Sequence, residues 1–278
     1  MRCLRRVPNL CTAVKEIHSR DNPRYKALRR LVQSSQERRH AGLSVLDGVH
    51  LVAAYCEHLG RPEYVVVNRA GLANPEVQSI LESCGLEATV LGDVLFKEVS
   101  SVATPTGIIA VVTPPPPQPV PADLDVCVIL EGLQDPGNLG SILRTCAAAG
   151  VTHVLLSRGA VHAWSPRVLR AGMGAHFSLQ IHEHVDVLAA ARGFKGRVIA
   201  ACSAARHSLY DTDLTGRTAL LFGNEGGGLS PELRAASQLE VSIPMPGALE
   251  SLNVAAAVAV CLFERLRQLR EKGVIRDQ

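Results

Sequence analysis

The chain has 278 residues, which exceeds one typical domain and favours two. Hydrophobic residues make up 47% and charged residues 20%, a globular composition, and the formal charge of +3 is too small to identify a partner. Aromatic residues make up only 4%, which argues against nucleic-acid binding by stacking bases on a broad aromatic platform.

Residues 1–19 are predicted to form a basic N-terminal arm. This segment is rich in arginine but has no continuous apolar core, so it does not read as a secretory signal. Arginine and lysine outnumber acids up to residue 39, which suggests a polyanion partner. A solvated helical face explains the same charge pattern equally well.

The eight cysteines are scattered, with no C-x-x-C pair. This pattern argues for buried, reduced thiols rather than disulfides or a zinc site, and no metal site is predicted. No apolar run is long enough to span a membrane. We therefore expect a cytoplasmic protein with no membrane partner.

Residues 20–113 read as a small α/β domain, because helical periods alternate with short apolar strands. Asn22-Pro23 fits a helix start, with proline at the first helical position. The predicted helices are residues 22–40, 50–59, 75–84 and 93–100, and the predicted strands are residues 43–48, 63–68, 87–92 and 107–113.

Residues 114–123 read PPPPQPVPAD, which favours an extended polyproline linker between two domains. From residue 124 to residue 278 predicted strands again alternate with predicted helices. This alternation predicts a mostly parallel sheet with ligands bound at the carboxyl ends of its strands. We predict strands at residues 126–130, 153–157, 177–183 and 197–203, two more strands leading into Gly223 and Pro244, helices at residues 138–149, 165–172 and 185–192, and a long closing helix.

Three loops that follow strands carry polar residues at the expected edge. Asn138 and Arg144 follow the first strand, Glu225 lies in the second loop, and Ser251 and Asn253 lie in the third. The glycines around Glu225 would let a ligand approach the backbone closely. They form neither a Walker loop nor a dinucleotide-binding motif, which disfavours a nucleotide-dependent enzyme.

Some of these residues also have a purely structural interpretation. Asn138 or Ser251, taken alone, is more simply a helix cap. Arg144 lies in an apolar helical stretch, and its core-like neighbours favour a function over simple solvation. His182 and His184 would share one face of a strand by alternation, but no third metal ligand accompanies them.

Together the three loops resemble the signature motifs of the SpoU (TrmH-type) RNA 2′-O-methyltransferases of the SPOUT superfamily. The motifs are DPGNLGSILRT at residues 135–145, LFGNEGGGLS at residues 221–230, and IPMPG at residues 243–247 followed by SLNV at residues 251–254. They occur in the order of the family, and jointly they are highly specific. Residues 20–113 resemble the RNA substrate-binding domain of the same family.

The resemblance implies an α/β C-terminal domain with a deep trefoil knot, preceded by the smaller α/β domain. It also implies S-adenosylmethionine as the cofactor, RNA rather than DNA as the substrate, and a homodimer whose active site is completed across the interface. By motif, the cofactor-binding residues would be Gly223, Ile243, Met245 and Leu252, and the catalytic set would be Asn138, Arg144, Glu225, Ser251 and Asn253.

The chemistry of the family fits these residue types. The enzyme must align a ribose hydroxyl with the methyl donor and help to remove the hydroxyl proton. Arg144 is expected to contact the target phosphate and hydroxyl, and either to act as the base or to position it. A guanidinium normally stays protonated, which disfavours the role of base. Ala255 stands where the family commonly has another serine, and the rest of the set is intact.

The accessory domain favours 23S ribosomal RNA as the substrate, because minimal transfer-RNA members of the family often lack such an extension. A transfer-RNA 2′-O-methyltransferase is one alternative. The other is an RNA-binding or ribosome assembly factor that kept the fold and lost catalysis. Loss of Asn138, Arg144 or Glu225 would favour this last possibility, and all three are present.

Overall fold

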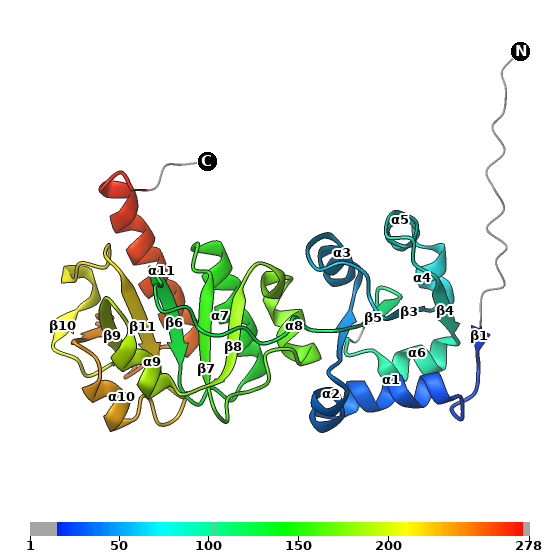
Figure 1. Cartoon of the computed structure of the whole chain (residues 1–278), viewed down its shortest axis with the longest axis horizontal. Coiled ribbons are helices and arrows are strands. Elements are labelled where there is room, and N and C mark those ends of the chain that lie inside the picture. Colours follow the sequence, from blue (N-terminus) through cyan, green and yellow to red (C-terminus); the bar gives the residue numbers. More distant parts are fainter. Residues whose placement is uncertain (1–15, 103, 275–278) are drawn as a thin grey trace, which may run out of the picture. The chain divides into compact units, whose positions relative to one another are not determined.

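The computed structural model describes residues 16–102 and 104–274, so residues 1–15 of the predicted arm lie outside the described residues. The chain divides into two compact units, one with residues 1–56 and 60–113 and the other with residues 57–59 and 114–278. Each unit has its own sheet, with helices packed against it (Figure 1).

The first unit contains a five-stranded mixed sheet in the order β1-β4-β3-β5-β2. β4 runs parallel to β1 and β3, whereas β5 runs antiparallel to β3 and β2. The strands are β1 (Glu16–Ile17), β2 (Ser44–Asp47), β3 (Tyr64–Val67), β4 (Ala88–Leu91) and β5 (Ile108–Val112).

The helices of the first unit follow the predicted pattern except near its start and at α4 (Arg69–Ala73), a short helix that was not predicted. Ser34 ends one helix and caps the next, because its Oγ accepts a hydrogen bond from the N–H of Glu37 at 3.2 Å. The single helix predicted over residues 22–40 is therefore wrong. The helices are α1 (Pro23–Gln33), α2 (Ser35–Ala41), α3 (Val49–His58), α4 (Arg69–Ala73), α5 (Pro75–Ser83) and α6 (Asp93–Val99).

The second unit contains a seven-stranded sheet in the order β10-β12-β9-β11-β6-β7-β8. All its neighbouring strands run parallel, which confirms the predicted α/β fold with a mostly parallel sheet. The knot remains a prediction from the resemblance. The strands are β6 (Val126–Leu130), β7 (His153–Ser157), β8 (Gln180–Val185), β9 (Arg197–Ala201), β10 (His207–Ser208), β11 (Thr218–Phe222) and β12 (Leu239–Ser242).

Helices cover both faces of this sheet, as the continuous apolar runs of its central strands require. α9 and α10 pack around Ile129, Leu155 and Leu221 on one face, and α7 lies beside α8 and α11 on the other (Figure 1). The helices are α7 (Pro136–Ala148), α8 (Pro166–Gly172), α9 (Val187–Gly193), α10 (Pro231–Ala235) and α11 (Val254–Glu271), with short 3-10 turns η1 (Ala175–Phe177) and η2 (Leu209–Asp211).

The helices α7 and α8 touch backbone to backbone at Gly140. A Cβ atom on Gly140 would lie 2.4 Å from the Cβ of Ala171 and 2.7 Å from the carbonyl oxygen of Val168. Only glycine fits there without moving one of the two helices. The start of α7, which carries the first motif, is therefore fixed against α8.

The strand predicted at residues 177–183 is shifted, because η1 occupies its first residue and β8 begins at Gln180. The pairing of β8 with β7 contains an extra residue, and His184 has a left-handed backbone with φ 59°. His182 is consequently buried and His184 exposed, so the expected shared face for the two histidines is wrong. Across the described residues, no group of three or more His, Cys, Asp or Glu could hold a metal ion.

Candidate active site

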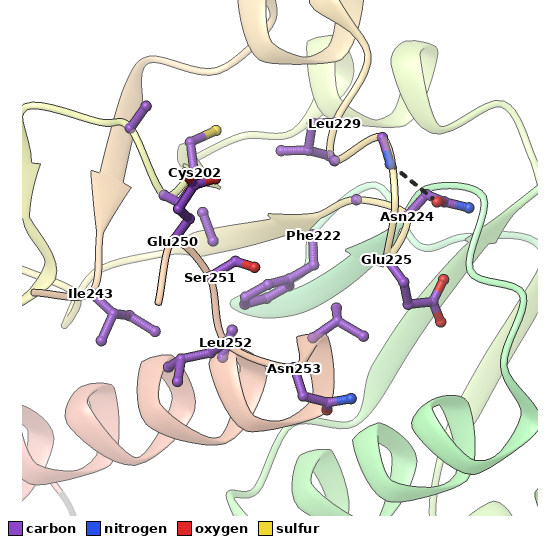
Figure 2. A pocket seen from close by; sticks show the side chains of 18 of the residues that line it. Cys202, Phe222, Asn224, Glu225, Leu229, Ile243, Glu250, Ser251, Leu252 and Asn253 are labelled. Carbon is purple, nitrogen blue, oxygen red and sulfur yellow. Dashed lines mark hydrogen bonds between the residues drawn. The ribbon is translucent and has the colours of Figure 1, made fainter. Parts of the chain in front are cut away.

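A cavity of about 470 Å³ lies where the loops after β11 and β12 meet the start of α11. Glu225 and Asn253 lie on one side of this cavity, and Ile243 lies across from them (Figure 2). Seven of the nine residues predicted for the site line the cavity, namely Gly223, Glu225, Ile243, Met245, Ser251, Leu252 and Asn253.

Asn138 is not the cap of α7. Asp135 caps this helix, because its Oδ1 accepts a hydrogen bond from the N–H of Asn138 at 2.7 Å. The side chain of Asn138 instead reaches the glycine-rich loop, where its Nδ2 donates to Glu225 Oε1 at 3.0 Å. The interpretation of Asn138 as a helix cap is therefore wrong.

Ser251 is not the cap of α11 either. The cap is Asn253, whose Oδ1 accepts hydrogen bonds from the N–H groups of Ala255 at 2.9 Å and Ala256 at 3.4 Å. Ser251 lies in the loop before this helix and lines the cavity. Its interpretation as a helix cap is wrong as well.

The amide of Asn253 completes a chain of side chains across the three motifs. Its Nδ2 donates to Asn138 Oδ1 at 2.9 Å, and Asn138 in turn donates to Glu225. Each asparagine thus uses both ends of its amide, one as donor and the other as acceptor. Three loops that are distant in the sequence are joined at one place.

Backbone donors from the first loop also bind the carboxylate of Glu225. The N–H groups of Gln134 and Asp135 donate to it at 3.4 Å and 3.3 Å. Partial burial raises the pKa of Glu225. Hydrogen bonds from the Asn138 side chain and from nearby backbone N–H groups together lower it by more than burial raises it, so the pKa is below its ordinary value. Glu225 is therefore an ionised acceptor that holds the first loop.

The glycine-rich loop folds back on itself around Asn224. The Asn224 side chain accepts hydrogen bonds from the N–H groups of Gly226 at 2.8 Å and Gly227 at 3.3 Å, and it donates to the carbonyl of Gly132 at 2.7 Å. A Cβ on Gly223 would lie 2.0 Å from the carbonyl carbon of Gly228. Gly223 must therefore be glycine for the loop to close.

Glu131 fixes the far end of the same loop, which the sequence did not reveal. Its carboxylate accepts hydrogen bonds from the N–H and the hydroxyl of Ser230, both at 2.7 Å. Ser230 also caps α10, where its Oγ accepts a hydrogen bond from the N–H of Leu233 at 3.3 Å. Ser230-Pro231 is a recognisable helix start in the sequence, but no sequence signal paired it with Glu131.

Arg144 is the predicted site residue that stands apart. It is exposed on α7 and does not line the cavity. Among the described residues, no hydrogen-bond or ion-pair partner holds its guanidinium. By contrast, Arg234, which lines the cavity, is bound by Glu240 through two hydrogen bonds of 3.0 Å and 2.7 Å.

The arrangement suits a medium-sized organic ligand with apolar and polar parts. Ile243, Met245 and Leu252 provide apolar surface, and the glycine-rich loop provides backbone groups with open space beside Gly227 and Gly228. The cavity volume lies within the range of about 300–1,000 Å³ that is usual for cofactor pockets. Arg144 remains available to a second, anionic ligand outside it.

Models of two protein families match the chain, one in each unit. The model of the SpoU rRNA Methylase family matches residues 125–263, and the model of the MRM3-like substrate binding domain matches residues 22–110. The two matches therefore cover the candidate site and the first unit separately.

Relatives and solved structures agree with these matches along most of the chain. An uncharacterized tRNA/rRNA methyltransferase of Synechocystis is 32% identical, covering 93% of this chain and 96% of that protein. The 23S rRNA (guanosine(2553)-2′-O)-methyltransferase RlmP of Bacillus subtilis is 30% identical, covering 90% of this chain and 98% of that protein.

Two crystal structures show the same fold. One is described as an RNA 2′-O ribose methyltransferase, with a TM-score of 0.80, 31% identity, and coverage of 91% of this chain and 98% of that one. The other is the SpoU methyltransferase AviRb from Streptomyces viridochromogenes in complex with the cofactor AdoMet, with a TM-score of 0.78, 26% identity, and coverage of 90% and 100%. With these likenesses and the three joined motifs, the chain belongs to the SpoU rRNA methylase family.

Proposed function

We propose that this protein transfers a methyl group from S-adenosylmethionine to a ribose 2′-hydroxyl of 23S ribosomal RNA. The observation that carries the proposal is the chain of hydrogen bonds from Asn253 through Asn138 to Glu225, which joins the three family motifs beside the cavity. The name of the Bacillus subtilis relative supports both the reaction and the ribosomal substrate, and the name of one aligned crystal structure supports the reaction.

The residues of the cavity fit S-adenosylmethionine. Leu252 and Ile243 would contact the adenosine part, and the backbone of Gly223 and its neighbours would hydrogen-bond the polar edges of the cofactor. When bound, the cofactor supplies an electrophilic methyl group on a positively charged sulfur. Glu225, ionised and turned toward the first loop, would add negative charge to the site.

The chain's own residues must bring the ribose hydroxyl into line and stabilise the developing oxyanion. We assign this to Arg144, because its guanidinium is exposed and no described group pairs with it. An arginine stays protonated, so Arg144 would bind the target phosphate and hydroxyl rather than take the proton, which would leave to solvent water. Ser251, in the loop beside the cavity, would accept or donate a hydrogen bond at the same centre.

The test is to map 2′-O-methyl groups in cellular RNA with and without this protein. Loss of a methyl group from 23S ribosomal RNA supports the proposal, whereas a loss from transfer RNA supports the alternative substrate. No loss in any RNA supports the non-catalytic RNA-binding factor. Complementation with Arg144→Ala separates catalysis from binding, because the variant should fold normally, bind S-adenosylmethionine and leave the RNA unmethylated.

The protein is also proposed to form a homodimer through α11. Phe263 on α11 is 48% exposed, so this helix presents a large apolar side chain that a partner could cover. Light scattering on wild type and Phe263→Glu would test this, because the charge should give a monomer. The first unit is proposed to bind the RNA, and a cytoplasmic location stays a prediction that fractionation would check.

A further inference from the structure

The segment after β7 is attached directly to the candidate site. The Oγ of Ser157 accepts a hydrogen bond from the N–H of Gly132 at 2.8 Å, and the carbonyl of Gly159 accepts one from Nε2 of Gln134 at 2.8 Å. Arg158 lies between these two anchored residues, and its side chain is exposed. Arg158 is therefore held next to the loop whose backbone binds Glu225.

A second exposed arginine lies on α8, which is fixed to the start of α7. Arg167 precedes Val168, whose carbonyl oxygen would lie only 2.7 Å from a Cβ atom on Gly140. Arg144 is one helical turn beyond Gly140 along α7. The loop after β7, α8 and α7 thus present Arg158, Arg167 and Arg144 from elements that pack together.

These arginines lack the carboxylate partners that hold some other exposed arginines of this unit. Arg217, Arg234 and Arg267 each pair with a carboxylate. Among the described residues, neither Arg158 nor Arg167 has a hydrogen bond or an ion pair through its guanidinium.

The sequence around Arg158 and Arg167 is also rich in positive charge. Residues 158–178 contain three arginines and no Asp or Glu. The nearby acids accept hydrogen bonds from groups other than these arginines: Asp135 caps α7, Glu225 binds the first loop, and Glu183 accepts a hydrogen bond from the N–H of Ala163. Unpaired guanidinium groups in such a segment suit phosphate oxygens, which they bind with paired N–H donors.

We propose that Arg158 and Arg167 bind backbone phosphates of the substrate RNA beside the target nucleotide. This inference rests on the proposed function, because it assumes that the ribose to be methylated is held near Arg144. The two arginines then fix the register of the RNA strand against the site and carry no base specificity, as phosphate contacts do. They add a second RNA contact, within the methyltransferase unit, to that proposed for the first unit.

The experiment uses the full chain and unmethylated 23S ribosomal RNA transcribed in vitro. Arg158→Gln, Arg167→Gln and the matched control Arg192→Gln are compared with wild type by filter binding over a salt series. Arg192 is also exposed, lies at the end of α9 toward the amino ends of the strands, and has no guanidinium partner in the described structure. Calorimetry of S-adenosylmethionine binding shows whether each variant keeps an intact cofactor pocket.

We expect each of the two site variants to weaken RNA binding by about three- to tenfold and to lower the slope of log K against log salt by about 0.7–0.9. Arg158→Lys and Arg167→Lys should restore the slope, whereas Arg192→Gln should match wild type. The inference would be overturned if Arg158→Gln and Arg167→Gln bound the RNA with the same affinity and the same salt slope as wild type and Arg192→Gln. If wild type itself neither binds nor methylates any RNA, the proposed function fails instead, so the two failures are distinct.

Discussion

Replacing Asn138 by alanine tests whether the hydrogen-bond chain through the three motifs assembles the site. Asn138→Ala removes the bond of 3.0 Å to Glu225 and the bond of 2.9 Å from Asn253. The backbone N–H of Asn138 still reaches Asp135, so the cap of α7 is retained. The variant therefore disconnects the loops without removing the helix start.

The effect on stability should be small. A hydrogen bond to a charged group contributes about 1.5–3 kcal/mol and one between neutral groups about 1 kcal/mol, and water replaces both at this exposed position. Alanine also favours the helix by about 0.5 kcal/mol over asparagine. We expect a net loss of about 1 kcal/mol, which lowers Tm by roughly 2–4 °C for a unit of this size.

The effect on catalysis should be much larger. Loss of the link lets the loops with Glu225 and Asn253 move independently, and misplaced catalytic groups commonly reduce kcat by about 100-fold or more. The assay is single-turnover methyl transfer to the 23S transcript. Asn74→Ala is the control, because it removes the cap of α5 in the other unit, a bond of 2.9 Å to Glu76, at a similar stability cost.

A double-mutant cycle completes the test. If Asn138 acts through Glu225, the double variant Asn138→Ala with Glu225→Ala should be no slower than Glu225→Ala alone. Strictly additive losses would show that the two residues act separately. A wild-type rate for Asn138→Ala beside a slow Glu225→Ala would refute the idea that the chain of hydrogen bonds organises the site.

Three further predictions follow from contacts in the second unit. Gly223→Ala should abolish S-adenosylmethionine binding by calorimetry, because its Cβ would lie 2.0 Å from Gly228, whereas Gly216→Ala, outside the cavity lining and with nothing within 4 Å, should bind normally. Glu131→Gln should weaken cofactor binding and lower the free energy of unfolding in urea by about 1–2 kcal/mol, because the N–H and the hydroxyl of Ser230 bind different oxygens of Glu131 and an amide nitrogen cannot accept in place of one of them. Unchanged values would show that the contact between Glu131 and Ser230 does not support the loop. Burial lowers the pKa of His176 to about 4, whereas the unfolded chain binds a proton at this residue below about pH 6.5. The free energy of unfolding of wild type should therefore fall by up to about 3 kcal/mol as the pH falls from about 6.5 to about 4. Urea unfolding should show a smaller fall for His176→Gln.

Much of the fold was predictable because the signals are local. The apolar runs of β6, β7 and β11 and the proline-rich segment of residues 114–123 predicted strands and a division of the chain that need no knowledge of distant contacts. The errors arose where a local signal had two meanings. Ser34 in residues 22–40 is compatible with a helix interior and with a cap, and in the structure its extended backbone (φ −120°, ψ 119°) makes it a cap.

The site was predictable only as a set of loops. Asn138 and Ser251 each read as a helix cap, yet Asp135 and Asn253 perform that role. Asn138 and Glu225 are 87 positions apart, and no periodicity pairs an amide with a carboxylate over that distance. The same limit hid the contact between Glu131 and Ser230, which are 99 positions apart.

Asn253 has a consequence for the dynamics of the last helix. The oxygen of its side-chain amide accepts hydrogen bonds from the N–H groups of Ala255 and Ala256 in the first turn of α11, and the nitrogen of the same amide donates a hydrogen bond to Asn138. Fraying of that turn and release of Asn138 are therefore one local opening rather than two independent events. Slow hydrogen exchange at the amides of these two alanines would report an assembled site, so a solvent-exchange measurement on a helix end would read the state of loops elsewhere in the chain.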